Sequence, residues 1–255
     1  MKTIHKKEDF EGMRKAGNLA AQTLDMLANY VKSGTTTSKL DSLAFDFIDK
    51  NKGLIAPLFY KGFPKSICTS LNHVICHGIP SNRILETGEI LNIDVTVIVD
   101  GWHGDTSRMF PVGKINNKAQ KLIDCTYESM MEGISVVSPN STLGDIGSAI
   151  QVYAENQNYS VVRDFCGHGL GKIFHEHPNI LHYGNVGEGE KIEEGMFFTV
   201  EPMINVGKYD IRMLPDGWTA VTKDKTLSAQ FEHSIAVTSD GYEIFTKSPA
   251  GLDKP

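Results

Sequence analysis

The sequence has no long hydrophobic run. No stretch reaches the roughly 18 consecutive apolar residues that predict a membrane-spanning helix. The basic start MKTIHKKEDF also lacks the apolar segment of about 7 to 15 residues that a signal peptide carries. Both absences argue against membrane association, and we expect a cytoplasmic protein.

Basic charge and paired cysteines are scarce as well. The 25 lysine and arginine residues are outnumbered by 31 aspartate and glutamate residues, for a formal net charge of −6, and they form no long block. This balance argues against a nucleic-acid-binding surface. The four cysteines contain no CxxC pair, which predicts reduced thiols in place of a disulfide framework or a zinc finger.

The residues that are present fit a globular protein. Of the 255 residues, 40% are hydrophobic and 22% are charged. A chain of this length buries roughly 70 to 75% of its unfolded surface, so it can form a sizeable core as one large domain or two small ones.

Two consecutive helices are predicted near the start of the chain. Apolar residues recur every three or four positions from Phe10 to Val31, a spacing typical of an amphipathic helix. A second apolar stripe follows, with Thr37 or Ser38 as its N-cap and Gly53 as its C-terminal stop.

The same order of helices recurs in the second half. Residues 117–137 give a further long helical pattern. The next helix is predicted after Thr142, which has Asp145 at the spacing of a capping box.

A strand-type run follows each pair of helices. GEILNID (88–94) and GMFFTVE (195–201) each place a carboxylate six residues after a glycine. Together with the repeated helices, this predicts an internal duplication within a single domain of residues 1–255. Its halves span roughly 8–112 and 117–246, and its core has pseudo-two-fold symmetry.

The run NIDVTVIVDGWHGDTSRMF predicts a β-hairpin. Its Asp100-Gly101 dipeptide favours a two-residue type I′ turn. Such a turn pairs Val99 with Trp102, Thr96 with Asp105 and Asp94 with Ser107. Asp94 and Asp105 then share one face of the hairpin as diagonal neighbours within about 8 Å.

Two unpaired carboxylates on a buried sheet face repel each other and lose hydration, so a positive charge is expected between them. The ordinary alternative is that each aspartate pairs with a lysine, an arginine or a backbone amide. However, Glu201 and Glu232 lie in further apolar strand-type runs. Four carboxylates and an imidazole suit divalent cations, and two ions about 3.5 to 4 Å apart form a common hydrolytic site.

The segment CGHGLGKIFHEHP (166–178) contains three histidines and three glycines. The glycines prevent a continuous helix and let the backbone come close to a ligand. A single histidine is more often structural than a ligand, and we interpret His177 and His182 as structural. A phosphate-binding loop is disfavoured, because neither a lysine-serine pair nor a clear helix follows.

Five motifs carry a family resemblance. SLNHVICHGIP, NIDVTVIVDGWHGDTSRMF, CGHGLGKIFHEHP, FTVEPM and DGWTAVTKDKTLSAQFEHS resemble, in this order, the bacterial type I methionine aminopeptidases. The resemblance extends from about residue 8 to residue 246. It implies the duplicated α+β "pita-bread" fold, an antiparallel sheet covered by helices. It also implies a dinuclear site for Mn, Fe(II), Co or Zn with the ligands Asp94, Asp105, His168, Glu201 and Glu232.

The resemblance also implies roles in catalysis. Glu201 would accept and return the proton of the attacking water, His175 would stabilise the oxyanion, and His77 would contact the substrate beside the leaving nitrogen. The residues matching the family's methionine pocket are Tyr60, Phe63, Cys68, Phe174 and Trp218. For each of these, core packing is the alternative interpretation.

Two residues depart from the family pattern. Lys61 stands where relatives often have histidine or asparagine, and His73 replaces a common glutamate. The first is expected to affect how residues beyond methionine are recognised, and the second to affect a loop. The family's monovalent cation site would lie near Asn72, Val74 and Ser228, and the His73 departure places it in doubt.

The predicted function is removal of the initiator methionine from nascent chains with a small second residue. The enzyme would act as a monomer on methionyl peptides and nascent polypeptides, also at the ribosome, with no nucleic acid required. One alternative is an Xaa-Pro peptidase of the same fold, which generally has an extra N-terminal domain and lacks this pocket pattern. Another is a non-catalytic peptide-binding module, but such proteins tend to lose metal ligands.

Overall fold

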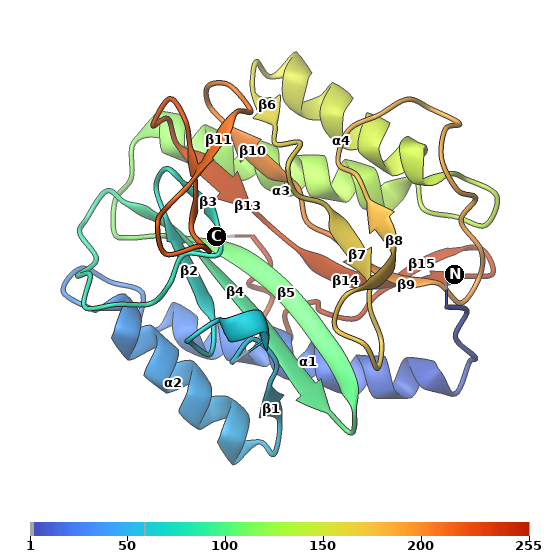
Figure 1. Ribbon diagram of the computed structural model, residues 1–255, viewed down its shortest axis with the longest axis horizontal. Coiled ribbons are helices and arrows are strands. Elements are labelled where there is room, and N and C mark those ends of the chain that lie inside the picture. The colour runs from blue at the N-terminus through green and yellow to red at the C-terminus, as the bar shows by residue number, and fades with distance from the viewer. Residues whose placement is uncertain (1–2, 59, 255) are drawn as a thin grey trace.

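The computed structural model describes residues 3–58 and 60–254. Two pairs of helices lie on opposite sides of the molecule, and antiparallel sheets fill the space between them (Figure 1). This is the expected α+β architecture. Within the described part of the chain, no helix is long and apolar enough to cross a membrane.

The first half begins with two helices and continues into short strands and one long hairpin. Its elements are α1 (Asp9–Ala28), α2 (Thr37–Lys50), β1 (Leu54–Ile55), the 3₁₀ turn η1 (Tyr60–Gly62), β2 (Cys68–Leu71), β3 (Val74–Cys76), β4 (Ile90–Val99) and β5 (Trp102–Pro111).

The second half repeats the order of two helices followed by strands. Its elements are α3 (Asn117–Ser135), α4 (Leu143–Asn156), β6 (Ser160–Val161), β7 (Gly167–Gly169), β8 (Glu176–Ile180), β9 (Phe197–Val200), β10 (Met203–Asn205), β11 (Ile211–Met213), β12 (Ala220–Thr222), β13 (Ser228–Gln230), β14 (His233–Thr238) and β15 (Gly241–Ile244). The repeated order supports an internal duplication, whose exact boundaries stay a prediction.

The helix boundaries differ in detail from those predicted. The N-cap of α2 is Thr36, one residue before the predicted Thr37 or Ser38, because the Thr36 hydroxyl accepts a hydrogen bond from the Lys39 amide at 3.1 Å. The helix ends at Lys50, three residues before the predicted stop at Gly53, and Lys52 takes the left-handed conformation (φ 61°). The fourth helix starts as predicted, because the Thr142 amide donates to the Asp145 carboxylate at 2.7 Å.

The long hairpin β4–β5 has the predicted register. Asp94 lies opposite Ser107, Thr96 opposite Asp105 and Val99 opposite Trp102. Asp100 and Gly101 have φ angles of 50° and 82°, as a type I′ turn requires. Side chains of β4 alternate between two surroundings. Ile93, Val95 and Val97 pack in a core cluster with residues of α1 and α2, so Asp94 and Thr96 point to the opposite face.

The second half contains a ladder interrupted at its centre. Strand β9 pairs with β14 through Val200 and His233, and β10 pairs with β13 through Met203 and Gln230. The register is the same on both sides of the gap, which places Glu201 opposite Glu232. The regular pairing therefore stops at these two carboxylates.

The two halves meet along β5. Ser107 forms a bridge with Glu232, whose amide donates to the Ser107 carbonyl at 3.0 Å. The Ser234 hydroxyl donates to the Asp105 carbonyl at 2.6 Å and accepts from the Asp105 amide at 3.2 Å. These bonds hold the acidic hairpin of the first half against the acidic ladder of the second.

Gly167 and Gly169 lie in strand β7, so no continuous helix forms here, and both are packed closely against backbone. A Cβ atom on Gly167 would lie 2.4 Å from the Thr199 carbonyl oxygen, and one on Gly169 would lie 2.5 Å from the His177 carbonyl oxygen. At these two positions the close approach is to neighbouring backbone within the sheet β14-β9-β7-β8. Glycine is needed there because any side chain would push these strands apart.

Candidate metal centre and substrate pocket

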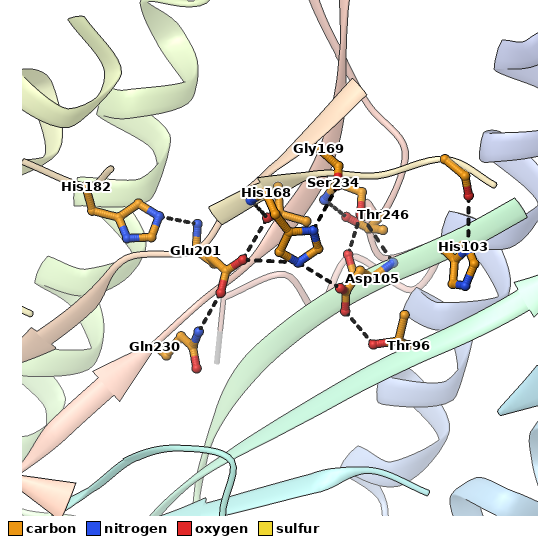
Figure 2. A network of polar contacts seen from close by, with 12 residues as sticks. Thr96, His103, Asp105, His168, Gly169, His182, Glu201, Gln230, Ser234 and Thr246 are labelled. Carbon is orange, nitrogen blue, oxygen red and sulfur yellow. Dashed lines mark hydrogen bonds and ion pairs between the residues drawn. The ribbon is translucent and has the colours of Figure 1, made fainter. Parts of the chain in front are cut away.

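Asp105 is buried on β5, with 4% of its surface exposed. The Thr96 hydroxyl, which lies opposite on β4, donates to Asp105 Oδ1 at 2.7 Å. This bond uses one carboxylate oxygen and leaves Oδ2 directed at His168, 3.6 Å from its Nε2 (Figure 2).

His168 comes from β7 and is held at its backbone and at its ring. Its amide donates to the Thr199 hydroxyl at 3.0 Å, and its Nδ1 lies 3.1 Å from the Gly169 carbonyl oxygen. Because a carbonyl oxygen only accepts, Nδ1 carries the proton and Nε2 presents a lone pair. Burial lowers the pKa of His168 to about 4, so the ring is neutral and able to ligate a metal.

Glu201 follows β9, and three other residues orient it. The Thr199 hydroxyl donates to Oε1 at 2.7 Å, and the Gln230 amide donates to Oε2 at 3.4 Å. The Glu201 backbone amide donates to His182 Nε2 at 3.1 Å, so the histidine interpreted as structural supports the site (Figure 2). Glu201 Oε1 is 3.7 Å from His168 Nε2.

The five predicted ligands converge. One potential ligand atom each from Asp105, His168 and Glu232 lies within 4.8 Å of the others, and Asp94 and Glu201 line the same cavity. Asp94 and Asp105 come from the first half of the chain, whereas the other three come from the second. The arrangement therefore depends on the contact between the halves.

Burial and mutual repulsion make this cluster unfavourable without a cation. Burial raises the pKa of Asp94 to about 7. Burial, and then the charges of neighbouring carboxylates, raise the pKa values of Asp105, Glu201 and Glu232 well above their usual range. Among the described residues, no lysine or arginine forms an ion pair with any of the four. Four carboxylates and one neutral imidazole thus fit the requirements of divalent metal ions.

A cavity of about 320 Å³ adjoins the carboxylates, within the usual range for small-ligand sites. All seven residues predicted to bind substrate line it: Tyr60, Phe63, Cys68, His77, Phe174, His175 and Trp218. Phe63 and Trp218 meet edge to face, with ring centroids 5.2 Å apart. Cys166, Phe165 and Met203 add apolar and sulfur-containing surface that the motifs did not single out.

His175 and His77 lie on the wall of the cavity. The His175 ring is 4.1 Å from the His168 ring and stacks on Tyr60 at 5.1 Å. Burial, and then the neighbouring His168, lowers the pKa of His175 to about 3. His77 has a left-handed backbone (φ 57°), packs against Trp218 at 6.2 Å, and has its pKa lowered by burial.

Most of the chain matches one family. The model of metallopeptidase family M24 matches residues 11–239. The chain belongs to metallopeptidase family M24. A metallopeptidase needs a metal site, and the cluster of carboxylates around His168 is a candidate for it.

Relatives within this M24 family are similar along almost their full length. The methionine aminopeptidase of Rickettsia prowazekii is 60% identical over 253 residues, which cover 99% of this chain and 98% of the relative. That of Escherichia coli K12 is 49% identical over 246 residues, covering 96% and 93%. These similarities confirm the family resemblance carried by the five sequence motifs.

Solved M24 structures confirm the pita-bread fold. The crystal structure of the Rickettsia prowazekii methionine aminopeptidase has a TM-score of 0.96 and covers 96% of this chain and 100% of that chain. The Thermotoga maritima methionine aminopeptidase, 33% identical, has a TM-score of 0.95, covering 96% and 99%. A prolidase from Pyrococcus furiosus shares the fold at 21% identity and a TM-score of 0.76, and this chain covers 65% of it.

The two departures from the family pattern lie in different places. Lys61 is exposed at the cavity wall, in a left-handed conformation (φ 47°), with its ammonium 5.3 Å from the Tyr60 ring. His73 lines a separate groove that does not include the carboxylates. Lys61 can therefore contact substrate, whereas His73 is set apart from the metal centre.

The residues named for the predicted monovalent cation site lie near one another. The Asn72 carbonyl accepts the Ser228 amide at 2.9 Å, and Val74 pairs with Val221 on β12. The Ser228 hydroxyl is buried without a hydrogen-bond partner among the described residues. The Asn72 side chain is already used, because it donates to Glu89 and accepts from the Ile90 amide. A cation there would rely on backbone carbonyls and the Ser228 hydroxyl.

Proposed function

We propose that this M24 metallopeptidase removes N-terminal methionine from peptides and nascent proteins whose second residue is small. The observation that carries the proposal is the junction of two surfaces. Ligand-type side chains converge at one part of the cavity, and aromatic and sulfur-containing side chains line the adjoining part. The similarity to methionine aminopeptidases over nearly the full chain supports the same conclusion.

The metal ligands in this proposal are Asp94, Asp105, His168, Glu201 and Glu232, which would hold two divalent ions. When bound, such ions polarise the substrate carbonyl and lower the pKa of a water molecule, so that a nucleophile exists at neutral pH. An oxygen-rich set with one imidazole admits manganese, iron(II), cobalt or zinc. A monovalent cation near Asn72, Val74 and Ser228 is a further part of the proposal.

Glu201 acts as the proton carrier. Thr199 and Gln230 fix the orientation of its carboxylate, so its oxygens face the cavity in a defined direction. From there it takes up a proton from the attacking water and later delivers it to the leaving amine.

His175 and His77 stabilise and orient the substrate. A neutral imidazole donates one N–H, and His175, whose pKa is lowered by burial, keeps that neutral form at working pH. It donates to the oxygen that becomes negatively charged during attack. His77, on the same cavity wall, contacts the substrate backbone beside the leaving nitrogen.

The apolar part of the cavity selects methionine. Tyr60 and Phe174, with ring centroids 4.8 Å apart, and Phe63 with Trp218 enclose a side chain of this shape. Contacts between sulfur and an aromatic ring add roughly 0.3 to 1.5 kcal/mol beyond burial. Methionine is therefore favoured over an unbranched apolar side chain without sulfur.

Release of free methionine from Met-Ala-Ser tests the proposal. Metal-stripped protein should release little methionine, and manganese, iron(II) or cobalt added under anaerobic conditions should restore release. Preferential hydrolysis of Ala-Pro peptides over Met-Ala peptides would reverse the choice in favour of an Xaa-Pro peptidase. A folded protein that cleaves neither substrate with any metal would support a peptide-binding module.

In the cell, we propose that the enzyme acts in the cytoplasm as a monomer, on chains as they emerge from the ribosome. Sedimentation of the purified protein alone tests the first part of this proposal, the monomeric state. Sedimentation with ribosomes tests the second part, the action on emerging chains. A stable dimer would contradict the first part, and failure to co-sediment with translating ribosomes would contradict the second.

A further inference from the structure

His103 lies on β5, two residues before Asp105, with only 8% of its surface exposed. It therefore points to the same face of the strand as Asp105, toward the second half of the chain (Figure 2). His103 does not belong to the cluster of close ligand atoms found among the described residues, which is formed by Asp105, His168 and Glu232. Its role must come from other contacts.

The first contact is with the loop of residues 170–175, which we call the His175 loop. This loop joins β7 to β8 and contains no helix or strand. Two groups of His103 donate to one oxygen of the loop, the Gly171 carbonyl, with the backbone amide at 2.9 Å and Nδ1 at 3.0 Å. Because the carbonyl can only accept, Nδ1 carries the ring proton.

The second contact lies further along the same loop. The His103 ring stacks on Phe174, with centroids 5.4 Å apart and an interplanar angle of 14°. Phe174 in turn contacts the next residue, His175, at 4.0 Å between ring centroids. The His175 ring is 4.1 Å from that of His168.

His103 thus contacts the His175 loop near both of its ends, by hydrogen bonds to Gly171 and by ring stacking on Phe174. The loop has other contacts as well, because Tyr60 packs on Phe174 and His175, and Lys172 lies over the Trp102 ring. Leu170 donates to the Phe197 carbonyl at 3.3 Å, and Gly171 donates within the loop to Ile173 at 3.2 Å. Through His103, the strand that carries Asp105 is connected directly to the loop that carries His175.

We propose that His103 is a positioning residue, which sets the distance between the metal centre and His175 by anchoring the His175 loop to β5. The proposal rests on the role of His175 given under Proposed function. It predicts that loss of the His103 anchor affects the chemical step through His175 and leaves metal binding unchanged.

Two substitutions separate the contacts. His103→Phe keeps an aromatic ring against Phe174 but removes the Nδ1–H donor, whereas His103→Asn keeps an N–H near that position and removes the ring. We expect His103→Phe to lower kcat by about tenfold, since small misplacements of a catalytic group have large effects. His103→Asn should recover part of this loss. KM and the metal dissociation constant should change less than about threefold.

A double-mutant cycle with His175→Ala decides whether His103 acts through His175. In the His175→Ala background, His103→Phe should lower kcat by less than about twofold, because the group being positioned is gone. The same tenfold loss in both backgrounds, or a parallel loss of metal affinity, would overturn the proposal. His177→Phe is the matched control, because this histidine is largely exposed and contacts Glu190; it should leave kcat unchanged.

Hydrogen exchange of the metal-free proteins gives a readout that needs no catalysis. Amides of residues 170–175 should exchange at least about fivefold faster in His103→Phe than in the wild type, and those of α3 should be unchanged. Equal exchange in the loop would overturn the anchor even if the enzyme releases methionine normally. Failure of the wild type to release methionine, together with faster loop exchange in the variant, would instead contradict the proposed function and leave the anchor supported.

Discussion

At the residue scale, Glu201 combines two roles that are usually separate. It is a proposed metal ligand and the proposed proton carrier, and its two oxygens already have different hydrogen-bond partners, Thr199 and Gln230. One oxygen of such a group can ligate a metal while the other exchanges a proton. A substitution that keeps the shape and removes the charge therefore tests both roles together.

We expect Glu201→Gln to fold normally and to lose activity by at least about a hundredfold, the low end for a catalytic acid-base group. Release of methionine from Met-Ala-Ser measures the loss, and circular dichroism checks the fold. Metal binding measured by calorimetry separates a lost ligand from a lost base. Near-normal turnover would remove Glu201 from the mechanism.

Lys61 places a positive charge at the cavity wall, where the proposed substrate's residues beyond methionine would pass. No carboxylate among the described residues forms an ion pair with it. We expect the wild type to favour an acidic over a basic third residue by about two- to fivefold in kcat/KM, the range of an exposed ion pair. Lys61→Glu should reverse this order.

Competition between Met-Ala-Glu and Met-Ala-Lys peptides measures the Lys61 preference. The effect should shrink at high salt, because exposed charges are screened. Lys121→Glu on α3 makes the same charge change away from the cavity and should leave the preference unchanged. An unaltered preference in Lys61→Glu would show that Lys61 does not contact this part of the substrate.

Some site residues can be predicted from the sequence, whereas the residues that orient Glu201 cannot. Asp105 could be placed opposite Thr96 from the turn alone, because a two-residue loop fixes the register of a hairpin. The partners Thr199, Gln230 and His182 carry no such signal. Threonine and glutamine are common strand residues, and only the folded arrangement shows that their donors reach Glu201 or its neighbours.

At the element scale, β7 shows how the backbone limits the sequence. Its glycines let this strand lie close to β9 on one side and to β8 on the other. We expect Gly169→Ala to lower the melting temperature by about 3 to 10 °C, since forcing a methyl group against backbone costs typically 1 to 3 kcal/mol. Activity should fall with it, because His168 precedes this residue.

Gly241→Ala is the matched control for Gly169→Ala. Gly241 is the first residue of strand β15, and a Cβ atom at this position would meet no atom within 4 Å. Its melting temperature should stay within about 2 °C of the wild type. Calorimetry of both variants gives the comparison, and an unchanged melting temperature in Gly169→Ala would mean that β7 and β8 can move apart freely.

Element types were easier to predict than element ends. The helical stripe after residue 36 was correct, but its cap lies one residue earlier, because three successive threonines offer equivalent side chains at this point. The strand-type run that contains Glu232 is split into two strands, β13 and β14, with Glu232 between them. The break follows from contact with β5 of the other half, which no local pattern encodes.

At the scale of the whole molecule, the acidic cluster links metal binding, protons and stability. The folded-state pKa of Asp94, about 7, is above its ordinary value of 3.8. The folded state therefore holds this proton more tightly than the unfolded state does. The contribution of this proton to the free energy of unfolding is fully present below pH 3.8. It is lost as the pH rises through 7.

We therefore expect metal-free Asp94→Asn to melt at least about 3 °C above the metal-free wild type at pH 8, with the difference vanishing toward pH 4. Buried histidines destabilise both proteins equally in acid, so they cancel in the comparison. Manganese should raise the melting temperature of the wild type more at pH 8 than at pH 5.5, because protons compete for the ligands. Equal melting temperatures of the two metal-free proteins at pH 8 would contradict the expectation.

The division of the five proposed ligands between the two halves has a consequence for the order of synthesis. Asp94 and Asp105 leave the ribosome first, but the set is completed only when Glu232, 127 residues after Asp105, has emerged. Until that residue emerges, the early carboxylates have no partner site for a shared metal. An enzyme proposed to act on growing chains would therefore itself be inactive as a growing chain until Glu232 has emerged, and would gain its metal and its activity together only after that point.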